Sequence, residues 1–353
     1  MLTCSKLTPM IALASAAVLT MTGCGASTEP SGAGQSESPA AGGSSEALTV
    51  YNAQHDSLTQ AWADAFTAET GIEVTLRQGS DYELSNQIIA EGEASPADVF
   101  LTENSPAMTQ VANAGLFAEV NTDIIEQVPA EYRPSTNMWT GIAARSTVFV
   151  YNEDAIDESE LPESIMDLQN EQWNGRWGAS PTGADFQAIV SAMLELEGEE
   201  ATAQWLAAMK DNAEAYKGNT AVMKAVNAGQ IDGGVIYHYY YYGDQAETGE
   251  NSDNVSLHYF KDQDPGAFVS VSGGGVLASS DQPDQAQQFL TFITGKAGQQ
   301  VLQDGDSFEY PVASGVAPNE ALVPLEELEA PEIDAAKLNS EKVTELMIDA
   351  GLL

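Results

Sequence analysis

The chain has 353 residues, of which 43 % are hydrophobic, so it is long enough to bury two hydrophobic cores. Twelve basic residues stand against 53 acidic residues and give a formal net charge of −41, which argues against binding to nucleic acid or to anionic lipid headgroups. The two cysteines, Cys4 and Cys24, both lie near the N-terminus, so we expect neither a disulfide framework nor a thiolate metal site.

Residues 1–24 have the pattern of a secretory signal. Lys6 supplies a weakly positive start, and the largely apolar run from Met10 to Met21 is too short to span a bilayer. Small residues directly before Cys24 resemble a lipobox, so Cys24 is expected to become the lipidated N-terminus of the mature chain. The alternative is a plain cleaved signal peptide. Residues 25–47 are rich in Gly, Ser, Pro and Ala, which predicts a disordered tether.

The pattern from residue 48 onward predicts an α/β fold. Leu48 to Ala53 alternates as a strand, and a helix with apolar residues at every fourth position follows, for which Ser57 is the expected cap. Ile72 to Leu76 predicts the next strand. A helix between two strands favours a right-handed crossover and a parallel sheet. Ala97 to Leu101 predicts a further buried strand, followed by a helix from Ser105 to Ala114.

Two potential metal donors follow these predicted strands. His55 lies just past the end of the first strand, and Glu103 lies just past the strand that ends at Leu101. In open α/β sheets ligands bind outside the carboxyl ends of the strands, so both side chains are expected at the same edge. Each one alone also fits a solvated loop residue.

The next segment predicts a passage into a second lobe and a potential anion site. Thr147 to Tyr151 predicts a strand, with Arg145 just before it. The small-residue loop from Gly178 to Phe186 leads into a helix, and free N–H groups at a helix start can hold a small anion. Most such loops simply start a helix, and Asp185 would repel an anion unless it serves as a cap.

Five tyrosines fall within six residues, Tyr237 and Tyr239 to Tyr242, after the predicted strand from Ile231 to Ile236. A phenol has a pKa of about 10 and is a poor ligand in water, but a hard trivalent cation such as iron(III) converts it into a good anionic oxygen ligand. The same run fits a protein interface, the rim of a core or a surface that stacks on a sugar.

The C-terminal part alternates between strands and helices. His258 to Phe260 and Ala267 to Val271 predict strands, and the triple glycine that begins at Gly273 predicts close backbone packing because it lacks the lysine and spacing of a phosphate loop. A helix with Pro283 in its first turn follows, and Ser340 is expected to cap a last helix.

From residue 48 to residue 353, the order of these features resembles the ferric ion-binding receptors of bacterial iron(III) ABC importers. The segments that carry the resemblance are Val50 to His55, Ala68 to Leu76, Pro96 to Glu103, Tyr239 to Tyr242 and Gln263 to Ala267.

The resemblance implies an α/β fold in the form of a two-lobed, periplasmic-binding-protein-like clamp. Each lobe would be a mixed sheet flanked by helices, with the ligand in the cleft between the lobes. The first lobe is expected to comprise residues 48–145 plus about 269–318, and the second lobe residues 146–268 plus about 319–353.

The resemblance also implies the ligands. His55 and Glu103 match the metal donors of one lobe, and Tyr239 and Tyr240 match those of the other. An exogenous anion such as phosphate or carbonate completes the metal shell in this family. The matching anion positions here are Thr182, Gly183, Ala184, Asn219 and Arg145. Two departures from the family pattern stand out: Tyr237 and His238 replace small amides, and Asp185 replaces a small neutral residue.

The implied function is extracytoplasmic capture of Fe(III) and its delivery to the permease of an ABC importer. We expect a monomer at the outer face of the cytoplasmic membrane, anchored through Cys24 and without a nucleic-acid partner. The alternative is a two-lobed receptor for a polyamine, sugar or organic anion that stacks on the tyrosines. An enzyme is not expected, because no constellation of a nucleophile with a base or of paired carboxylates is visible.

Overall fold

The structure, a computed structural model, describes residues 47–353. The predicted signal segment with Cys24, and the predicted tether apart from its last residue, lie outside the described residues. Within residues 47–353, no helix combines the length and the apolar character that a membrane crossing requires.

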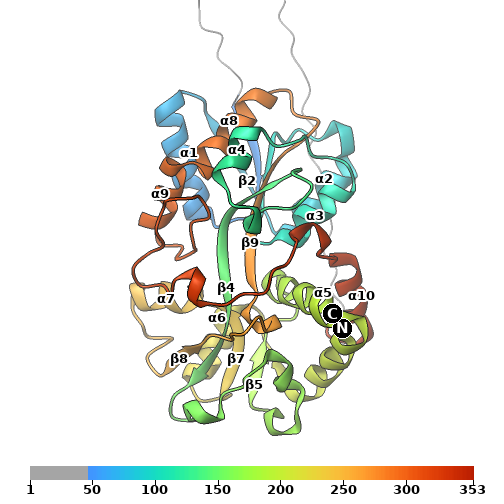
Figure 1. The fold of residues 1–353 in the computed structure, drawn as a ribbon, viewed down its shortest axis with the longest axis vertical. Coiled ribbons are helices and arrows are strands. Elements are labelled where there is room, and N and C mark those ends of the chain that lie inside the picture. Colours follow the sequence, from blue (N-terminus) through green and yellow to red (C-terminus); the bar gives the residue numbers. More distant parts are fainter. Residues whose placement is uncertain (1–46) are drawn as a thin grey trace, which may run out of the picture. The chain divides into compact units, whose positions relative to one another are not determined.

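The described chain forms one mixed sheet with the strand order β2-β1-β3-β9-β4-β7-β5-β6, and β8 pairs with β4 (Figure 1). The predicted α/β fold is confirmed, since strands and helices alternate along the chain. The strands are β1 (Leu48–Asn52), β2 (Val74–Gln78), β3 (Val99–Leu101), β4 (Thr140–Asn152), β5 (Trp177–Ala179), β6 (Ala213–Ala215), β7 (Gly233–Tyr237), β8 (Val255–His258) and β9 (Val269–Val276).

The long strand β4 belongs to two halves of this sheet. Residues 140–146 pair antiparallel with β9, whereas residues 147–151 pair antiparallel with β7. We call β2, β1, β3, β9 and the first part of β4 the first half-sheet, and we call β7, β5, β6, β8 and the second part of β4 the second half-sheet. The first half-sheet has β1 parallel to β2 and β3, and the second has β5 parallel to β6 and β7.

Helices cover both faces of each half-sheet. Apolar residues of α1, α8 and α9 pack on one face of the first half-sheet, and those of α2 and α3 pack on the other. In the second half-sheet, α5 and α10 pack on one face and α6 packs on the other. The α-helices are α1 (Asp56–Thr70), α2 (Asp81–Glu91), α3 (Ser105–Asn113), α4 (Thr122–Gln127), α5 (Ala184–Asn212), α6 (Asn219–Asn227), α7 (Tyr239–Glu247), α8 (Pro283–Thr294), α9 (Lys296–Asp304) and α10 (Ser340–Asp349).

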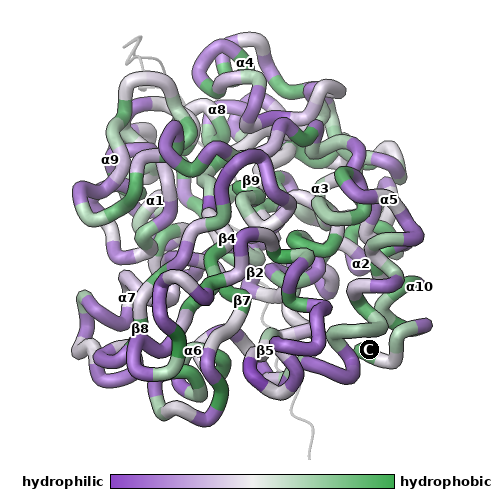
Figure 2. Tube along the Cα trace, turned by 60° about the horizontal axis from the view of Figure 1, so that its bottom comes forward, coloured by the Kyte–Doolittle hydropathy of each residue, from purple (hydrophilic) through white to green (hydrophobic). Residues whose placement is uncertain are grey.

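The hydropathy of the chain follows this layering. Figure 2 shows hydrophobic stretches along the inner strands and on parts of the helices, with hydrophilic segments in the outer loops. Each half-sheet therefore has its own buried core, and the two halves are connected through β4 and β9, which pair with each other. The two cores that the length of the chain allowed are both present.

Several predicted boundaries are corrected. The helix after β1 begins at Asp56 with His55 in the N-cap position, so Ser57 is not its cap. The last helix is capped by Asn339, whose side chain accepts a hydrogen bond from the Lys342 N–H at 2.9 Å, and not by Ser340. The segment from Ala184 to Asn212 carries the single label α5, but Gly198 inside it has a non-helical backbone with φ 81° and ψ 172°, so two helical stretches meet there at a kink.

The triple glycine lies inside β9, and its predicted close packing is confirmed. A Cβ atom added to Gly273 would lie 2.2 Å from Cγ of Met108, and one added to Gly275 would lie 2.6 Å from the Phe117 ring. The glycines therefore let α3 and the segment around Phe117 approach the centre of the first half-sheet, and they form no phosphate loop.

Candidate metal centre

His55 lies where β1 turns into α1. Its backbone carbonyl accepts hydrogen bonds from the N–H of Thr59 at 3.0 Å and from the Thr59 hydroxyl at 3.1 Å, and its own N–H donates to Oε1 of Gln54 at 2.8 Å. The backbone on both sides of His55 is thus held, while its imidazole remains 22 % exposed. This side chain is free to meet a ligand from a fixed position.

Glu103 follows β3 and faces His55. The Asp81 carboxylate, in the first turn of α2, accepts hydrogen bonds from the N–H groups of Glu103 and Asn104 at 2.9 and 3.0 Å, which holds the turn after β3. Because β1 and β3 are parallel neighbours, both turns leave the same edge of the sheet. Glu103 Oε1 consequently lies 3.1 Å from His55 Nε2.

The charged forms of His55 and Glu103 stabilise each other. Burial opposes the imidazolium form, but Glu309 and Glu103 outweigh it and raise the pKa of His55 above its usual value. Burial also opposes the Glu103 carboxylate, yet the contacts with His55 and Arg145 lower the pKa of Glu103. Both shifts favour the charged forms of His55 and Glu103 when no metal lies between them.

Tyr239 and Tyr240 reach the same place from the second half-sheet. They begin α7 directly after β7, and their rings stack with centroids 4.3 Å apart. The Tyr239 ring also meets the His55 ring edge-on at 4.9 Å. The structure thus brings together the four predicted metal donors, His55, Glu103, Tyr239 and Tyr240, from three separate segments of the chain.

The carboxylate of Asp185 lies at the centre of the tyrosine hydroxyls. The hydroxyls of Tyr239 and Tyr240 donate to its Oδ2 at 3.2 and 3.1 Å. The side-chain amides of Asn219 and Asn104 donate to Oδ2 at 2.7 Å and to Oδ1 at 2.9 Å. Burial, followed by the charge of Glu103, raises the pKa of Asp185. A side chain that the sequence marked only as a departure in an anion loop is therefore in contact with two predicted donors.

Tyr239 and Tyr240 keep their phenol protons until a cation displaces those protons. Burial, and next the charge of Asp185, raises the pKa of Tyr239 and that of Tyr240 well above 10. At neutral pH both phenols are therefore neutral and donate hydrogen bonds. A strongly charged cation at this point would displace both protons and gain two phenolate oxygens.

A buried ion pair lies behind His55. The sequence indicated only one of its two members, Arg145, as a candidate site residue. Arg145, on β4, pairs through Nη2 with Glu309 Oε1, and both side chains are fully buried. Glu309 precedes Tyr310, whose backbone forms an isolated bridge with Ala144 next to Arg145. Glu309 had no signal in the sequence, because it lies outside regular secondary structure and its position depends on this long-range bridge.

The other predicted anion-binding residues have mixed positions. Gly183 is the N-cap residue of α5 and Ala184 is the first residue of that helix, next to Asp185. The N–H of Gly183 donates to the carbonyl of Ser180 at 3.0 Å, and Thr182 is exposed. Asn219, at the start of α6, contacts Asp185 directly. The amide of Asn219 and the guanidinium of Arg145 are thus already paired with carboxylates of the chain.

The neighbours of the tyrosine pair have other partners. Tyr237 donates to Oδ1 of Asn104 at 3.2 Å, and the hydroxyls of Tyr242 and Tyr259 lie 3.3 Å apart. His238 Nδ1 accepts from the Ser146 N–H at 3.1 Å, and its Nε2 donates to the Phe308 carbonyl at 2.8 Å. Burial lowers the pKa of His238 to about 3, so its ring stays neutral and both nitrogens are used.

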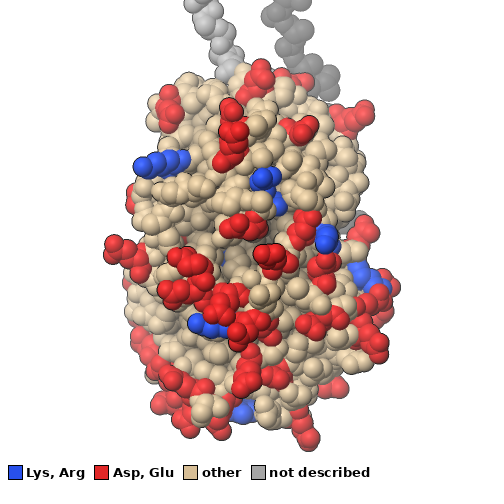
Figure 3. All heavy atoms as spheres, in the orientation of Figure 1, with Lys and Arg blue, Asp and Glu red and all other residues tan. Residues whose placement is uncertain are grey.

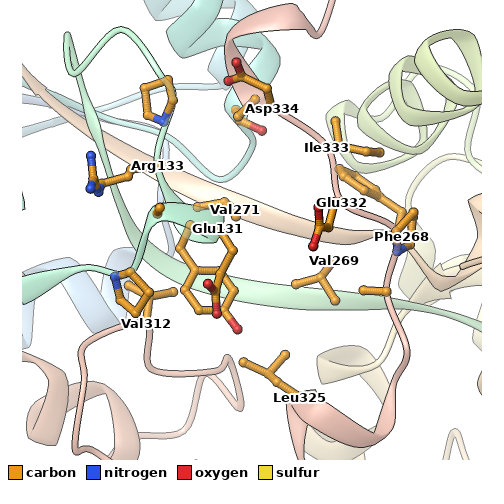
Figure 4. A pocket seen from close by; sticks show the side chains of 18 of the residues that line it. Glu131, Arg133, Phe268, Val269, Val271, Val312, Leu325, Glu332, Ile333 and Asp334 are labelled. Carbon is orange, nitrogen blue, oxygen red and sulfur yellow. The ribbon is translucent and has the colours of Figure 1, made fainter.

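A separate cavity of about 1060 Å³ contains none of the four predicted donors (Figure 4). Apolar side chains of Phe268, Val269, Val271 and Leu325 line part of it, and Glu131 and Glu332 stand among its walls. Among residues 47–353, no group of three or more His, Cys, Asp and Glu side chains has metal-binding geometry.

The chain is similar to curated iron-binding proteins over most of its length. It is 62 % identical over 308 residues to an "Fe(3+)-binding periplasmic protein" of Serratia marcescens, covering 87 % of this chain and 91 % of the relative. It is 35 % identical to a "major ferric iron-binding protein" of Neisseria meningitidis, covering 86 % of this chain and 93 % of that protein. The resemblance predicted from the sequence is confirmed by these relatives.

Solved structures confirm the predicted two-lobed clamp fold. Iron-bound HitA of Pseudomonas aeruginosa superimposes with a TM-score of 0.82 at 42 % identity, over 87 % of this chain and 99 % of HitA. A Trichodesmium protein solved with iron and citrate gives a TM-score of 0.77 at 26 % identity, over 87 % of this chain and all of that chain. A family model described as a bacterial extracellular solute-binding protein matches residues 94–339. The chain belongs to this family of bacterial extracellular solute-binding proteins.

Proposed function

We propose that this protein is an extracytoplasmic receptor that binds Fe(III) in its interlobe cleft and delivers the ion to an ABC importer. The observation that carries the proposal is the close grouping of four donor side chains. Glu103 Oε1 lies 3.1 Å from His55 Nε2, the Tyr239 ring lies 4.9 Å from the His55 ring, and the hydroxyls of Tyr239 and Tyr240 share Asp185 Oδ2. The iron-binding relatives support the same cargo. The role is binding and transfer, without catalysis.

The donor chemistry fits ferric iron. Two phenolates and the Glu103 carboxylate bring three negative charges to a trivalent ion, and the imidazole of His55 adds a neutral nitrogen donor. Hard anionic oxygen is the ligand type that such an ion prefers. The alternative receptor that stacks on tyrosines has less support, because Tyr239 is only 6 % exposed and its ring is already stacked on that of Tyr240.

We infer that Asp185 takes the part of the exogenous anion. Its Oδ2 already lies within 3.2 Å of both phenolic oxygens, so an ion that displaces the two phenol protons would meet this carboxylate as well. Asn219 and Arg145, two of the groups predicted to hold phosphate or carbonate, are paired with Asp185 and Glu309. The chain can therefore supply an internal carboxylate where the family resemblance implied an external anion.

Ion binding would couple to closure of the two lobes. We propose lobes of residues 48–145 plus about 269–318 and of residues 146–268 plus about 319–353, in line with the change of pairing partner within β4 after residue 146. His55 and Glu103 belong to the first lobe, and Tyr239, Tyr240 and Asp185 belong to the second. An ion that needs donors from both lobes favours the closed form, because only there are all contacts made.

Delivery requires the receptor to stay near its permease. We propose that the mature monomer is held at the outer face of the cytoplasmic membrane by lipidation of Cys24, with residues 25–47 as a tether. A single lipid-modified residue would be the anchor, so Cys24→Ala is expected to release the protein from the membrane fraction. An unchanged membrane fraction would contradict the anchor and leave the cargo proposal intact.

The visible absorbance of the loaded protein tests whether the bound ion is Fe(III) held by tyrosines. Phenolate donates charge into a vacant orbital of Fe(III), so the loaded protein should absorb visible light. Tyr239→Phe and Tyr240→Phe each remove a charged donor at nearly constant volume and should abolish or strongly weaken both colour and affinity. Tyr241→Phe and Tyr242→Phe are matched controls, because the Tyr241 ring packs edge-on against the Tyr242 ring and the Tyr242 hydroxyl contacts Tyr259. A parent protein that never colours with ferric salt would refute the proposal.

A further inference from the structure

Glu309 lies in a buried polar network directly behind His55. Three donors converge on its Oε1: Nη2 of Arg145, Nε2 of Gln54 at 3.1 Å and the Ser272 hydroxyl at 3.3 Å. Gln54 precedes His55, Arg145 comes from β4 and Ser272 comes from β9. The network therefore fixes one oxygen of Glu309 against both strands that connect the half-sheets.

The second oxygen of Glu309 has a different environment. Oε2 is buried and has no hydrogen-bond partner among the described residues, and it lies 3.5 Å from Nδ1 of His55. A buried carboxylate oxygen without a donor is costly, so a nearby N–H gains by turning toward it. The opposite ring nitrogen of His55, Nε2, lies 3.1 Å from Oε1 of Glu103, another of the proposed donors, and the His55 ring meets the Tyr239 ring edge-on.

We propose that Glu309 is a positioning residue that holds the Nδ1–H of His55 and thereby aims the Nε2 lone pair at the cargo ion. This inference rests on the proposed iron function. A carboxylate behind a metal-binding histidine fixes the tautomer and the ring orientation, and it increases the basicity of the ligating nitrogen. Arg145 in turn fixes the carboxylate, so one buried chain of contacts connects β4 to the orientation of a donor.

The network makes Glu309→Gln a sharp test. The three donors on the Oε1 side require the amide oxygen to take that place, so the amide NH₂ must face Nδ1 of His55. An NH₂ group can only donate, so Nδ1 would become the acceptor and the proton would move to Nε2. The substitution keeps the shape of the side chain and reverses the predicted tautomer, which takes the lone pair away from the ion.

The first readout is iron affinity, measured by competition against a chelator. Glu309→Gln should bind Fe(III) about 10- to 100-fold more weakly than the parent, which is the usual effect of losing such a partner. Glu91→Gln is the control: it makes the same chemical change at a carboxylate that accepts hydrogen bonds from Tyr51 and Ser95, so its affinity should equal that of the parent. Equal affinity of Glu309→Gln and the parent would overturn the proposal.

The second readout is the ¹⁵N spectrum of the imidazoles with Ga(III), a diamagnetic ion of the same charge. The chain has three histidines, and a His55→Ala spectrum assigns the signals. In the loaded parent, Nε2 of His55 should bind gallium while Nδ1 keeps a slowly exchanging proton. Gallium on Nδ1 would overturn the proposal, even if Glu309→Gln does not fold.

These results separate the two proposals. If the parent binds neither Fe(III) nor Ga(III), the proposed function fails. If the parent binds both ions but Glu309→Gln keeps the parental affinity and the His55 signals of the parent, only the positioning role fails. A Glu309→Gln protein that is merely less stable, with unchanged affinity, would assign Glu309 a structural role and refute the inference.

Discussion

Asp185 stands in the first turn of α5, where a negative side chain is favoured by the free N–H groups of the helix start. Its carboxylate nevertheless points at two tyrosine hydroxyls and two asparagine amides. The helix start thus helps a buried carboxylate to tolerate its surroundings. Its partners are those that an incoming cation would rearrange, which favours a role in metal binding over a role as a cap.

If Asp185 replaces the exogenous anion, iron loading of the parent should need neither phosphate nor carbonate. Asp185→Asn removes the charge at constant shape and should weaken Fe(III) binding. The variant should also become sensitive to phosphate, because the remaining amides can then hold an external anion. Titrations with and without phosphate, in buffer freed of carbonate, measure both effects. A parent that loads only when phosphate or carbonate is present would instead support the anion that the family resemblance implied.

His55 and Glu103 were predictable from sequence because both follow strands of a parallel pair, so their convergence needed only the topology. The run of tyrosines was visible in the sequence as an unusual cluster of potential oxygen ligands. Only the family resemblance assigned Tyr239 and Tyr240 to the metal. Glu309 was not predictable, since its contact with Arg145 joins residues 164 positions apart through a non-repetitive segment. Asp185 was visible as a departure, but nothing local indicates that its carboxylate faces the tyrosines.

Among the elements, β9 shows how composition and position combine. Its triple glycine has a low strand propensity, yet β9 pairs with both β3 and β4 at the centre of the first half-sheet. The packing around the strand explains the glycines, because any other residue at these three positions would place a Cβ atom within 3 Å of a side chain that packs across the strand. The close approach of α3 to the sheet, directly after Glu103, depends on this bare backbone.

Gly273→Ala should therefore destabilise the fold. The new methyl group would lie 2.2 Å from Cγ of Met108, so α3 or the strand must shift, and overpacking of this kind costs about 1–3 kcal/mol. Urea denaturation of the metal-free protein measures the change. Gly243→Ala is the control: it lies in α7 with nothing within 4 Å of the new methyl group, so it should be neutral or stabilising by about 0.5–1 kcal/mol. Equal midpoints for Gly273→Ala and the parent would show that the site relaxes freely.

Periodic patterns predicted the elements well where burial is one-sided, as in α1 and α8. They failed where tertiary contacts decide. Residues 140–146 of β4 include Gly, Ala, Arg and Ser, which do not favour strands, and pairing with β9 holds them extended. Within α5, in contrast, the local preference of glycine holds, because Gly198 has a non-helical backbone with φ 81° and ψ 172° that interrupts the helix.

At the scale of the whole molecule, the charged side chains at the surface are mostly acidic. Figure 3 shows acidic side chains distributed over the visible face with few basic ones between them. The three ion pairs that Lys337 and Lys342 form with glutamates are partly exposed and contribute little each. The excess of negative charge is therefore not neutralised by pairing, and its repulsion acts on the folded state as a whole.

The net charge of −41 predicts a stability that depends on salt. The screening length falls from about 30 Å at 0.01 M salt to about 8 Å at 0.15 M, a distance that isolates most surface carboxylates from one another. The melting temperature of the metal-free protein should therefore rise steeply over this interval and level off above it. Sucrose at matched osmolarity is the control, since it stabilises folded proteins without screening charge. A melting temperature that stays constant between 0.01 and 0.15 M sodium chloride would mean that the unfolded chain suffers the same repulsion as the folded one.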